Sequence, residues 1–310
     1  MKARASASLS AHNSHIPGTV SNAAARDLRE AGFGHGIFRV TWYGVNILLF
    51  AALVGVLWTA AWEYSTECYL RGFSDAVIPF SAAPTRKIEA ILHWMGHSPA
   101  RFDQAPESMA DDRDPTDTLN YASLLSVCGT ATNAFLNLAD TGGLTVRRLL
   151  LLDVNRTTVH VVAEVLIDGR WIIVDPVFHT IFRGTDGGML TSQQLASPIV
   201  FRRATQNIPG YLPTYTFDRA VHVRLSHFGP LGRWVRNIWG VPAWEGWPVL
   251  SLIMERESLE LFVVFAFLVL CLLIVRGVLR WYGEARLGIR MEHMYRKLFR
   301  AGRLLFEPTD

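Results

Sequence analysis

Two long uncharged stretches constrain this chain more than any other feature of its sequence. The first, Val45–Ala61, reads VNILLFAALVGVLWTAA, and the second runs from Leu261 to Val275. An α-helix needs about 20 mostly apolar residues to cross the hydrocarbon core of a bilayer, and tryptophan and tyrosine mark its ends. Such residues lie on both sides of the first stretch and follow the second at Trp281 and Tyr282. We therefore predict membrane-spanning helices over residues 42–62 and 259–279.

Each stretch also has a second explanation. A cleaved signal peptide contains an apolar run too, but residues 1–41 make a longer lead than a signal peptide normally has. The second stretch could be a helix buried in a soluble domain, although such a helix is rarely apolar on every face. Half of the 310 residues are hydrophobic and 18% are charged, which excludes a disordered or collagen-like chain.

The charges predict how the chain lies in the membrane. Residues 1–41 carry five Lys or Arg against two acids, and residues 276–310 carry eight against four. Residues 63–258 carry 17 basic and 20 acidic residues. Basic segments next to spans stay in the cytoplasm. We expect a two-pass inner-membrane protein with a largely disordered cytoplasmic tail over 1–41, a basic cytoplasmic tail over 280–310 and an outward, periplasmic domain between the spans. The same argument explains the basic residues without a nucleic-acid partner.

Residues 63–258 are long enough for one domain. Hydrophobic periodicity predicts helices first and an antiparallel sheet afterwards, which is an α+β fold. The expected helices cover residues 84–94, 117–125 and 127–139, the last with Ser126 as N-cap, and the expected strands cover residues 146–154, 158–167 and 170–175. Residues 98–117 form an acidic loop, for which we favour a solvated surface over a calcium site because the spacing fits no EF-hand.

The pair Asp168-Gly169 is a strong signal for a two-residue type I′ hairpin. With that loop, Ile167 pairs with Arg170, and side chains that alternate along each strand place His160 and Asp175 on one face. They become diagonal neighbours about 7–8 Å apart along the backbone, a gap that an imidazole and a carboxylate can bridge.

Cys128 adds a nucleophile to this pair. It falls in the first turn of the predicted helix after Ser126, where the helix N-terminus stabilises a thiolate, and its backbone N–H can serve as an oxyanion donor. Each of these residues has a structural explanation when taken singly: a buried Cys as a small core residue, a strand His as a hydrogen-bonded one, and an Asp before Pro as a turn former. Together they form the parts of a nucleophile–base–orienter triad.

These residues resemble the transglutaminase-like superfamily. The resemblance rests on Cys128-Gly129 at a helix start, on Gly143–Arg147 (GLTVR), and on HVVAEVLIDGRWIIVDP from His160 to Pro176, and it covers roughly residues 115–180. It implies a papain-like or transglutaminase-like core in which Cys128 is the nucleophile, His160 the general base and acid, and Asp175 the orienter. It also implies acyl transfer through a thioester.

The expected function is that of a membrane-anchored, cysteine-dependent peptidase or amidase acting on a peptide or amide at the outer face of the inner membrane. Transglutaminase-type amine transfer, which cross-links proteins, is the first alternative. A non-catalytic scaffold in an envelope assembly is the second. The expected partners are a peptide or protein substrate and the lipid bilayer. No cofactor is expected, because the sequence has no glycine-rich phosphate loop.

Three further residues are candidates for the oxyanion site or the cleft: Asn120, Tyr121 and His179. The position two residues after His160 often holds an aromatic residue in the family, and here it is Val162. Glu164 and Trp171 also match the motif, but we expect both to be structural, with Glu164 paired to Arg147 or Arg148.

The remaining features allow more than one interpretation. A zinc site at His93 and His97 is disfavoured because we expect the helix to end between them, at Gly96. A disulfide between Cys68 and Cys128 would block the nucleophile and stays an alternative in an oxidising compartment. The four tryptophans of residues 229–247 favour contact with the lipid interface, and an aromatic rim beside the cleft is the other possibility.

Overall fold

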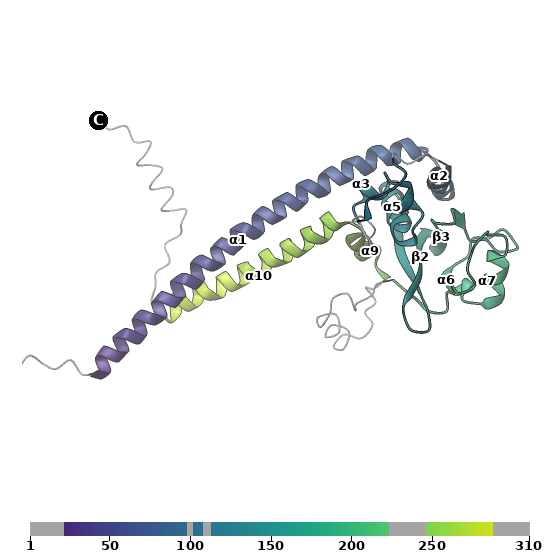
Figure 1. The fold of residues 1–310 in the computed structure, drawn as a ribbon. Helices are drawn as coiled ribbons and strands as arrows, with labels where there is room; N and C mark the ends of the chain where they lie inside the picture. Colours follow the sequence, from purple (N-terminus) through teal and green to yellow (C-terminus); the bar gives the residue numbers. More distant parts are fainter. Residues whose placement is uncertain (1–21, 98–101, 108–112, 223–245, 288–310) are drawn as a thin grey trace, which may run out of the picture. The chain divides into compact units, whose positions relative to one another are not determined.

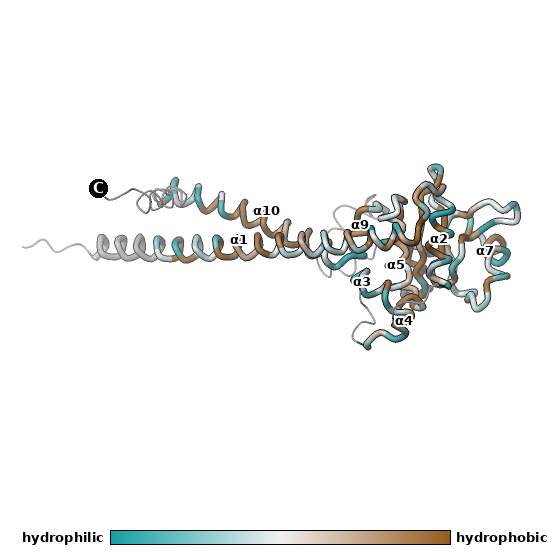
Figure 2. Tube along the Cα trace, turned by 90° about the horizontal axis from the view of Figure 1, so that it is seen from above, coloured by the Kyte–Doolittle hydropathy of each residue, from teal (hydrophilic) through white to brown (hydrophobic). Residues whose placement is uncertain are grey.

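The computed structural model of this chain describes residues 22–97, 102–107, 113–222 and 246–287. The chain divides into two compact units, one of residues 1–51 with 269–310 and one of residues 52–268. Two helices are long and apolar enough to cross a membrane: α1 (Asn22–Val77) and α10 (Glu257–Ala285). Figure 2 shows that apolar residues run along much of both. α1 is helical from Asn22 onward, well before the predicted boundary at residue 41, and it continues beyond residue 62.

Glycines let α1 and α10 approach each other closely in both units. In the first unit, a Cβ added at Gly283 would lie 2.6 Å from the Phe38 ring, and Phe38 is buried. In the second unit, a Cβ at Gly55 would lie 2.7 Å from the ring of Phe265. Small residues allow this kind of close contact between membrane helices, where van der Waals packing is a main source of attraction.

The second unit is an α+β domain, as predicted, and Figure 1 shows its helices beside its sheet. Between α1 and α10 the elements are α2 (Pro84–His97), α3 (Pro115–Thr118), α4 (Ala122–Leu125), α5 (Cys128–Thr141), β1 (Val146–Leu152), β2 (Thr158–Ile167), β3 (Arg170–Asp175), β4 (Thr180–Ile181), α6 (Ser192–Leu195), α7 (Pro198–Thr205), β5 (Ala220–Val221) and α9 (Pro248–Glu255). The strands form an antiparallel sheet in the order β4-β3-β2-β1-β5.

The central hairpin has the predicted register. Ile167 pairs with Arg170, and β2 and β3 have the predicted bounds. Asp168 and Gly169 take φ values of 49° and 75°, the left-handed conformation that a type I′ turn requires at both positions. β1 ends at Leu152 rather than at residue 154, because the next residue turns the chain: the Asp153 carboxylate accepts the N–H of Thr157 at 2.7 Å.

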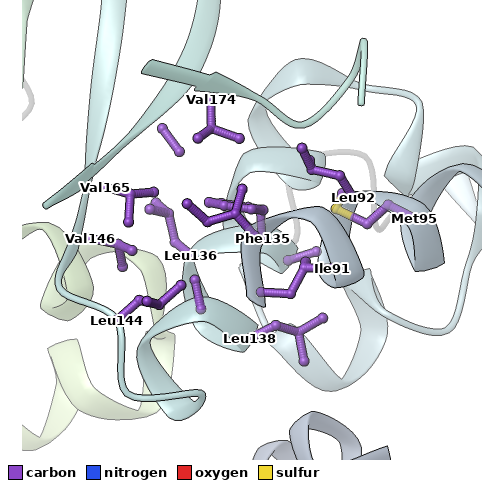
Figure 3. Close-up of a cluster of buried hydrophobic side chains, with 14 of the residues drawn as sticks. Ile91, Leu92, Met95, Phe135, Leu136, Leu138, Leu144, Val146, Val165 and Val174 are labelled. Atoms are coloured by element: carbon purple, nitrogen blue, oxygen red, sulfur yellow. The ribbon is translucent and has the colours of Figure 1, made fainter. Parts of the chain in front are cut away.

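Apolar side chains cover both faces of the sheet. One cluster joins α2 and α5 to one face, with Phe135 and Leu136 fully buried at its centre (Figure 3). A second cluster joins the other face to Phe182, Phe201 and Phe217, which come from the segments after β3. The sheet is therefore buried on both sides, and α5 lies against β1 and β2.

Three predicted helix boundaries are wrong. Ser126 is not an N-cap: it ends α4, its hydroxyl donates to the Ser123 carbonyl at 2.7 Å, and Val127 precedes α5. The helix predicted over residues 117–125 splits into α3 and α4, because the chain at Tyr121 bridges to Phe102. α2 continues through Gly96 to His97, since a single glycine weakens a packed helix without ending it.

Candidate active site

Cys128 is the first residue of α5, and the helix around it is tied down at several points. The Thr132 hydroxyl donates to the Val161 carbonyl of β2 at 3.2 Å. The Thr130 hydroxyl donates to the Leu124 carbonyl of α4. Cys128 itself is half-buried. The start of α5 is thus fixed beside the strand that carries His160, while the thiol keeps access to solvent.

His160 and Asp175 form a buried hydrogen-bonded pair. The distance between Nε2 of His160 and Oδ2 of Asp175 is 2.7 Å, and the two side chains are 2% and 0% exposed. The other carboxylate oxygen of Asp175 accepts the N–H groups of Val177 and Phe178 at 3.1 and 3.3 Å. Both oxygens of the carboxylate are therefore held, and the imidazole is fixed in one orientation.

The thiol of Cys128 interacts with the imidazole of His160. Because Asp175 occupies Nε2, the nitrogen that remains for the thiol is Nδ1. The hydrogen bond with His160 lowers the pKa of Cys128, against the opposing effect of burial. Burial by itself would lower the pKa of His160, but the hydrogen bonds with Asp175 and Cys128 outweigh it and raise this pKa to about 9. The two shifts together favour a thiolate–imidazolium pair at neutral pH.

Aromatic rings that the sequence did not lead us to expect surround the imidazole. Tyr215 stacks on His160 with ring centroids 4.2 Å apart and an interplanar angle of 7°. Tyr211 and Phe178 meet the same ring edge-on, at 6.0 and 5.9 Å. Burial and the nearby charge of Asp175 raise the pKa of Tyr211 well above its usual range, so this hydroxyl stays protonated. The only signal in the sequence is the repeated aromatics between residues 211 and 217, which carry no indication of their partner.

The other three candidates make their described contacts with other residues, although His179 lies near enough to Asp175 for that charge to oppose the lowering of its pKa by burial and by His97. The Asn120 amide donates to the Thr116 carbonyl within its own turn. Tyr121 packs against Phe102 with ring centroids 5.3 Å apart. His179 is exposed, and its ring lies against Gly96 of α2. None of the contacts described above joins Asn120, Tyr121 or His179 to the Cys128 thiol or to the His160 imidazole.

Glu164 and Trp171 hold the other end of the sheet together. The buried Glu164 carboxylate accepts Arg147 Nε at 2.6 Å, the Ser192 hydroxyl at 3.0 Å and lies 2.8 Å from His222 Nε2. The Arg147 guanidinium also lies 3.8 Å from the centre of the Trp171 ring. Of the two predicted partners for Glu164, the structure selects Arg147.

The thiols and imidazoles elsewhere do not add to this group. All three cysteines are free, so the alternative disulfide between Cys68 and Cys128 is absent. The rings of His93 and His97 stack at 4.5 Å. Within the described ranges, no three His, Cys, Asp or Glu side chains are grouped so as to hold a metal ion. Residues 229–245 of the predicted aromatic segment, and residues 98–101 and 108–112 of the acidic loop, lie outside the described residues.

Fold and site together define an α+β domain with a Cys–His–Asp group at the start of a helix, in a chain with two candidate membrane helices. No protein-family model, curated protein or solved structure matches the chain.

Proposed function

We propose that this chain is a membrane-anchored cysteine-dependent acyl-transfer enzyme with a transglutaminase-like or papain-like core. The observation that carries the proposal is the buried His160–Asp175 pair, 2.7 Å between Nε2 and Oδ2, with the Cys128 thiol on the imidazole. A nucleophile, a base beside it and a third group that orients the base are the requirements of covalent acyl transfer.

The reaction follows from these positions. The Cys128 thiolate attacks the carbonyl carbon of an amide, and a C–S bond forms. When the C–N bond breaks, His160 gives its proton to the leaving amine and a thioester remains. Water then attacks the thioester while His160 takes a proton, and the thiolate leaves with the acid product free. The backbone N–H at the start of α5 is a suitable hydrogen-bond donor for the negative charge that develops on the carbonyl oxygen.

Hydrolysis is the favoured outcome, and an amine in place of water would make the same thioester an intermediate of protein cross-linking. A scaffold without activity is the second alternative, and its support is that the described side-chain contacts of Asn120 and Tyr121 are with Thr116 and Phe102. An inner-membrane location with the domain outside remains a proposal from the charge distribution. A peptide or protein substrate near the bilayer suits that location.

The test is the rate at which iodoacetamide alkylates Cys128 as a function of pH. The detergent-solubilised full chain is used, with Cys68 and Cys271 replaced by alanine. We expect the rate to rise through a midpoint well below the free-thiol value of about 8.5. His160 keeps its proton up to about 9, so the thiolate–imidazolium pair exists between the lowered thiol pKa and that value. In His160→Ala the midpoint should return toward that of a free thiol.

His222→Ala is the matched control. His222 also lies 2.8 Å from a buried carboxylate, that of Glu164, but on the far end of the sheet face. His222→Ala should leave the pH midpoint of Cys128 alkylation unchanged. A midpoint at the free-thiol value that does not respond to His160→Ala would reject the enzyme and leave the scaffold.

A further inference from the structure

One face of α5 carries a row of polar groups that all turn toward the same place. Gly129, Asn133, Asn137 and Asp140 follow each other at intervals of about one helical turn. Their partners converge on the break between α9 and α10, which we call the α9–α10 junction (Glu255 and Arg256). At Arg256 the chain leaves helical geometry, with φ −124° and ψ 113°, and α10 starts at the next residue.

Glu255 connects the junction to the turn that bears the nucleophile. It is 1% exposed, and its Oε1 lies 2.8 Å from Arg148 Nη1 of β1. The other end of the same guanidinium, Nη2, donates to the Gly129 carbonyl at 2.8 Å. Asn133 of α5 donates to the second oxygen of Glu255 at 3.2 Å. A buried ion pair between Glu255 and Arg148 and a hydrogen bond from Arg148 to the Gly129 carbonyl thus connect Glu255 to the residue that follows Cys128.

Arg256 fixes the rest of the same helix face. It is 4% exposed and donates from Nε to Asn137 at 2.6 Å. Its Nη1 donates to Glu63 and Glu67 of α1 at 2.8 and 2.9 Å. The start of α10, the end of the apolar part of α1 and the helix of the nucleophile are joined in this one set of contacts.

Stability alone is a weak reason for such an arrangement. Charges lose their hydration when buried, and an apolar pair of similar volume is often at least as stable as a buried ion pair. A planar guanidinium does offer something an apolar side chain does not: two donors at fixed positions, which fix the distance between two acceptors. Here the two groups that Arg148 contacts belong to the nucleophile's turn and to Glu255, the last residue of α9, two residues before α10 begins.

We propose that Arg148 and Glu255 are positioning residues for Cys128, which hold the first turn of α5 in the place where the thiol meets His160 and tie that place to the start of α10. The inference rests on the proposed function, because positioning matters only to a thiol that reacts. On this proposal, the position of the start of α10 affects the reactivity of the Cys128 thiol.

The adjacent Arg147 provides a matched comparison. Arg147 and Arg148 follow each other on β1, and each pairs with a Glu whose side chain is 1% exposed, at 2.6 and 2.8 Å. Arg147→Gln and Arg148→Gln therefore each break one buried ion pair, but only Arg148 reaches Gly129. We expect Arg148→Gln to lower the alkylation rate of Cys128 at neutral pH about tenfold or more and to raise its pH midpoint, the scale expected for loss of a hydrogen bond to a charged group. Arg147→Gln should stay within about twofold of the parent.

Thermal melting of the same full-length proteins in detergent separates positioning from folding. Equal losses of melting temperature with a change of midpoint only in Arg148→Gln support the proposal. Equal midpoints in both variants overturn it, whatever the melting temperatures. If Arg148→Gln does not fold, Arg148→Lys and Arg147→Lys replace the pair. Lysine keeps the charge but lacks the fork, so Arg148→Lys should slow alkylation and Arg147→Lys should not.

His160→Ala distinguishes the two proposals. A midpoint that responds to His160→Ala but not to Arg148→Gln keeps the enzyme and rejects the positioning role. A midpoint that responds to Arg148→Gln but not to His160→Ala rejects the triad, and with it the positioning of the thiol against His160.

Discussion

At the scale of single residues, the site depends on one imidazole that is charged although it is buried. His160 is 2% exposed, and an isolated buried histidine would be neutral. Its pKa of about 9 reflects carboxylate and thiolate partners that outweigh desolvation. The contribution of this charge to stability is fully present below the ordinary value of about 6.5 and is lost as the pH rises through about 9. The hydrogen bond with the same imidazole lowers the pKa of the Cys128 thiol.

The Tyr215 ring should support that charge. A cation over an aromatic face gains about 1 kcal/mol, which corresponds to roughly a fivefold change in equilibrium. Tyr215→Phe keeps the ring at 4.2 Å and should leave Cys128 alkylation within about twofold. Tyr215→Ala removes the ring and should slow alkylation at neutral pH about fivefold. Equal slowing in both variants would assign the effect to the hydroxyl. Rates equal to that of the parent in both variants would show that neither the ring nor the hydroxyl matters.

At the scale of elements, the hairpin between β2 and β3 sets the distance between His160 and Asp175. Both loop residues have positive φ, at 49° and 75°. The register fixed by this loop runs along both strands as far as the pair Ala163 and Val174, three residues from His160 and one from Asp175.

Gly169→Ala tests this element. An L-residue in the left-handed region costs about 1–2 kcal/mol, so the free energy of unfolding should fall by that amount. Denaturant unfolding of the detergent-solubilised chain measures the change. Gly72→Ala is the control, since Gly72 is helical with nothing within 4 Å of an added Cβ, and it should be neutral or slightly stabilising. A loss in Gly72→Ala as large as that in Gly169→Ala would contradict the role of the loop geometry.

At the scale of the whole molecule, two helices are apolar enough to cross a membrane, and the charge bias predicts on which side the domain lies. Residues 1–41 and 276–310, on the outer sides of the two apolar stretches, carry the excess of Lys and Arg. If both helices span, the domain and the termini lie on opposite sides of the bilayer.

Labelling with a membrane-impermeant maleimide tests the orientation. In a background with Cys68, Cys128 and Cys271 replaced by alanine, Val154→Cys puts a thiol on a residue that is 75% exposed in the domain. Ser6→Cys puts one in the N-terminal tail. In spheroplasts we expect the first to be labelled at once and the second only after lysis. The reverse pattern would overturn the predicted topology.

Local patterns in the sequence determined the apolar helices, the α+β class and the β2–β3 hairpin, because hydrophobic periodicity and a turn that needs two left-handed residues are properties of neighbouring residues. Strand alternation extends this to His160 and Asp175, because it places both side chains on one face of the sheet. Only the tertiary structure decided which arginine pairs with Glu164, which with Glu255, and which aromatic ring covers the imidazole. The position two residues after His160 holds Val162, and nothing there indicates that Tyr215 covers the imidazole. Arg147 and Arg148 are adjacent residues of the same type, so the sequence does not show which of them pairs with Glu164. These choices depend on how distant segments pack, and no short-range rule of spacing or propensity carries that information.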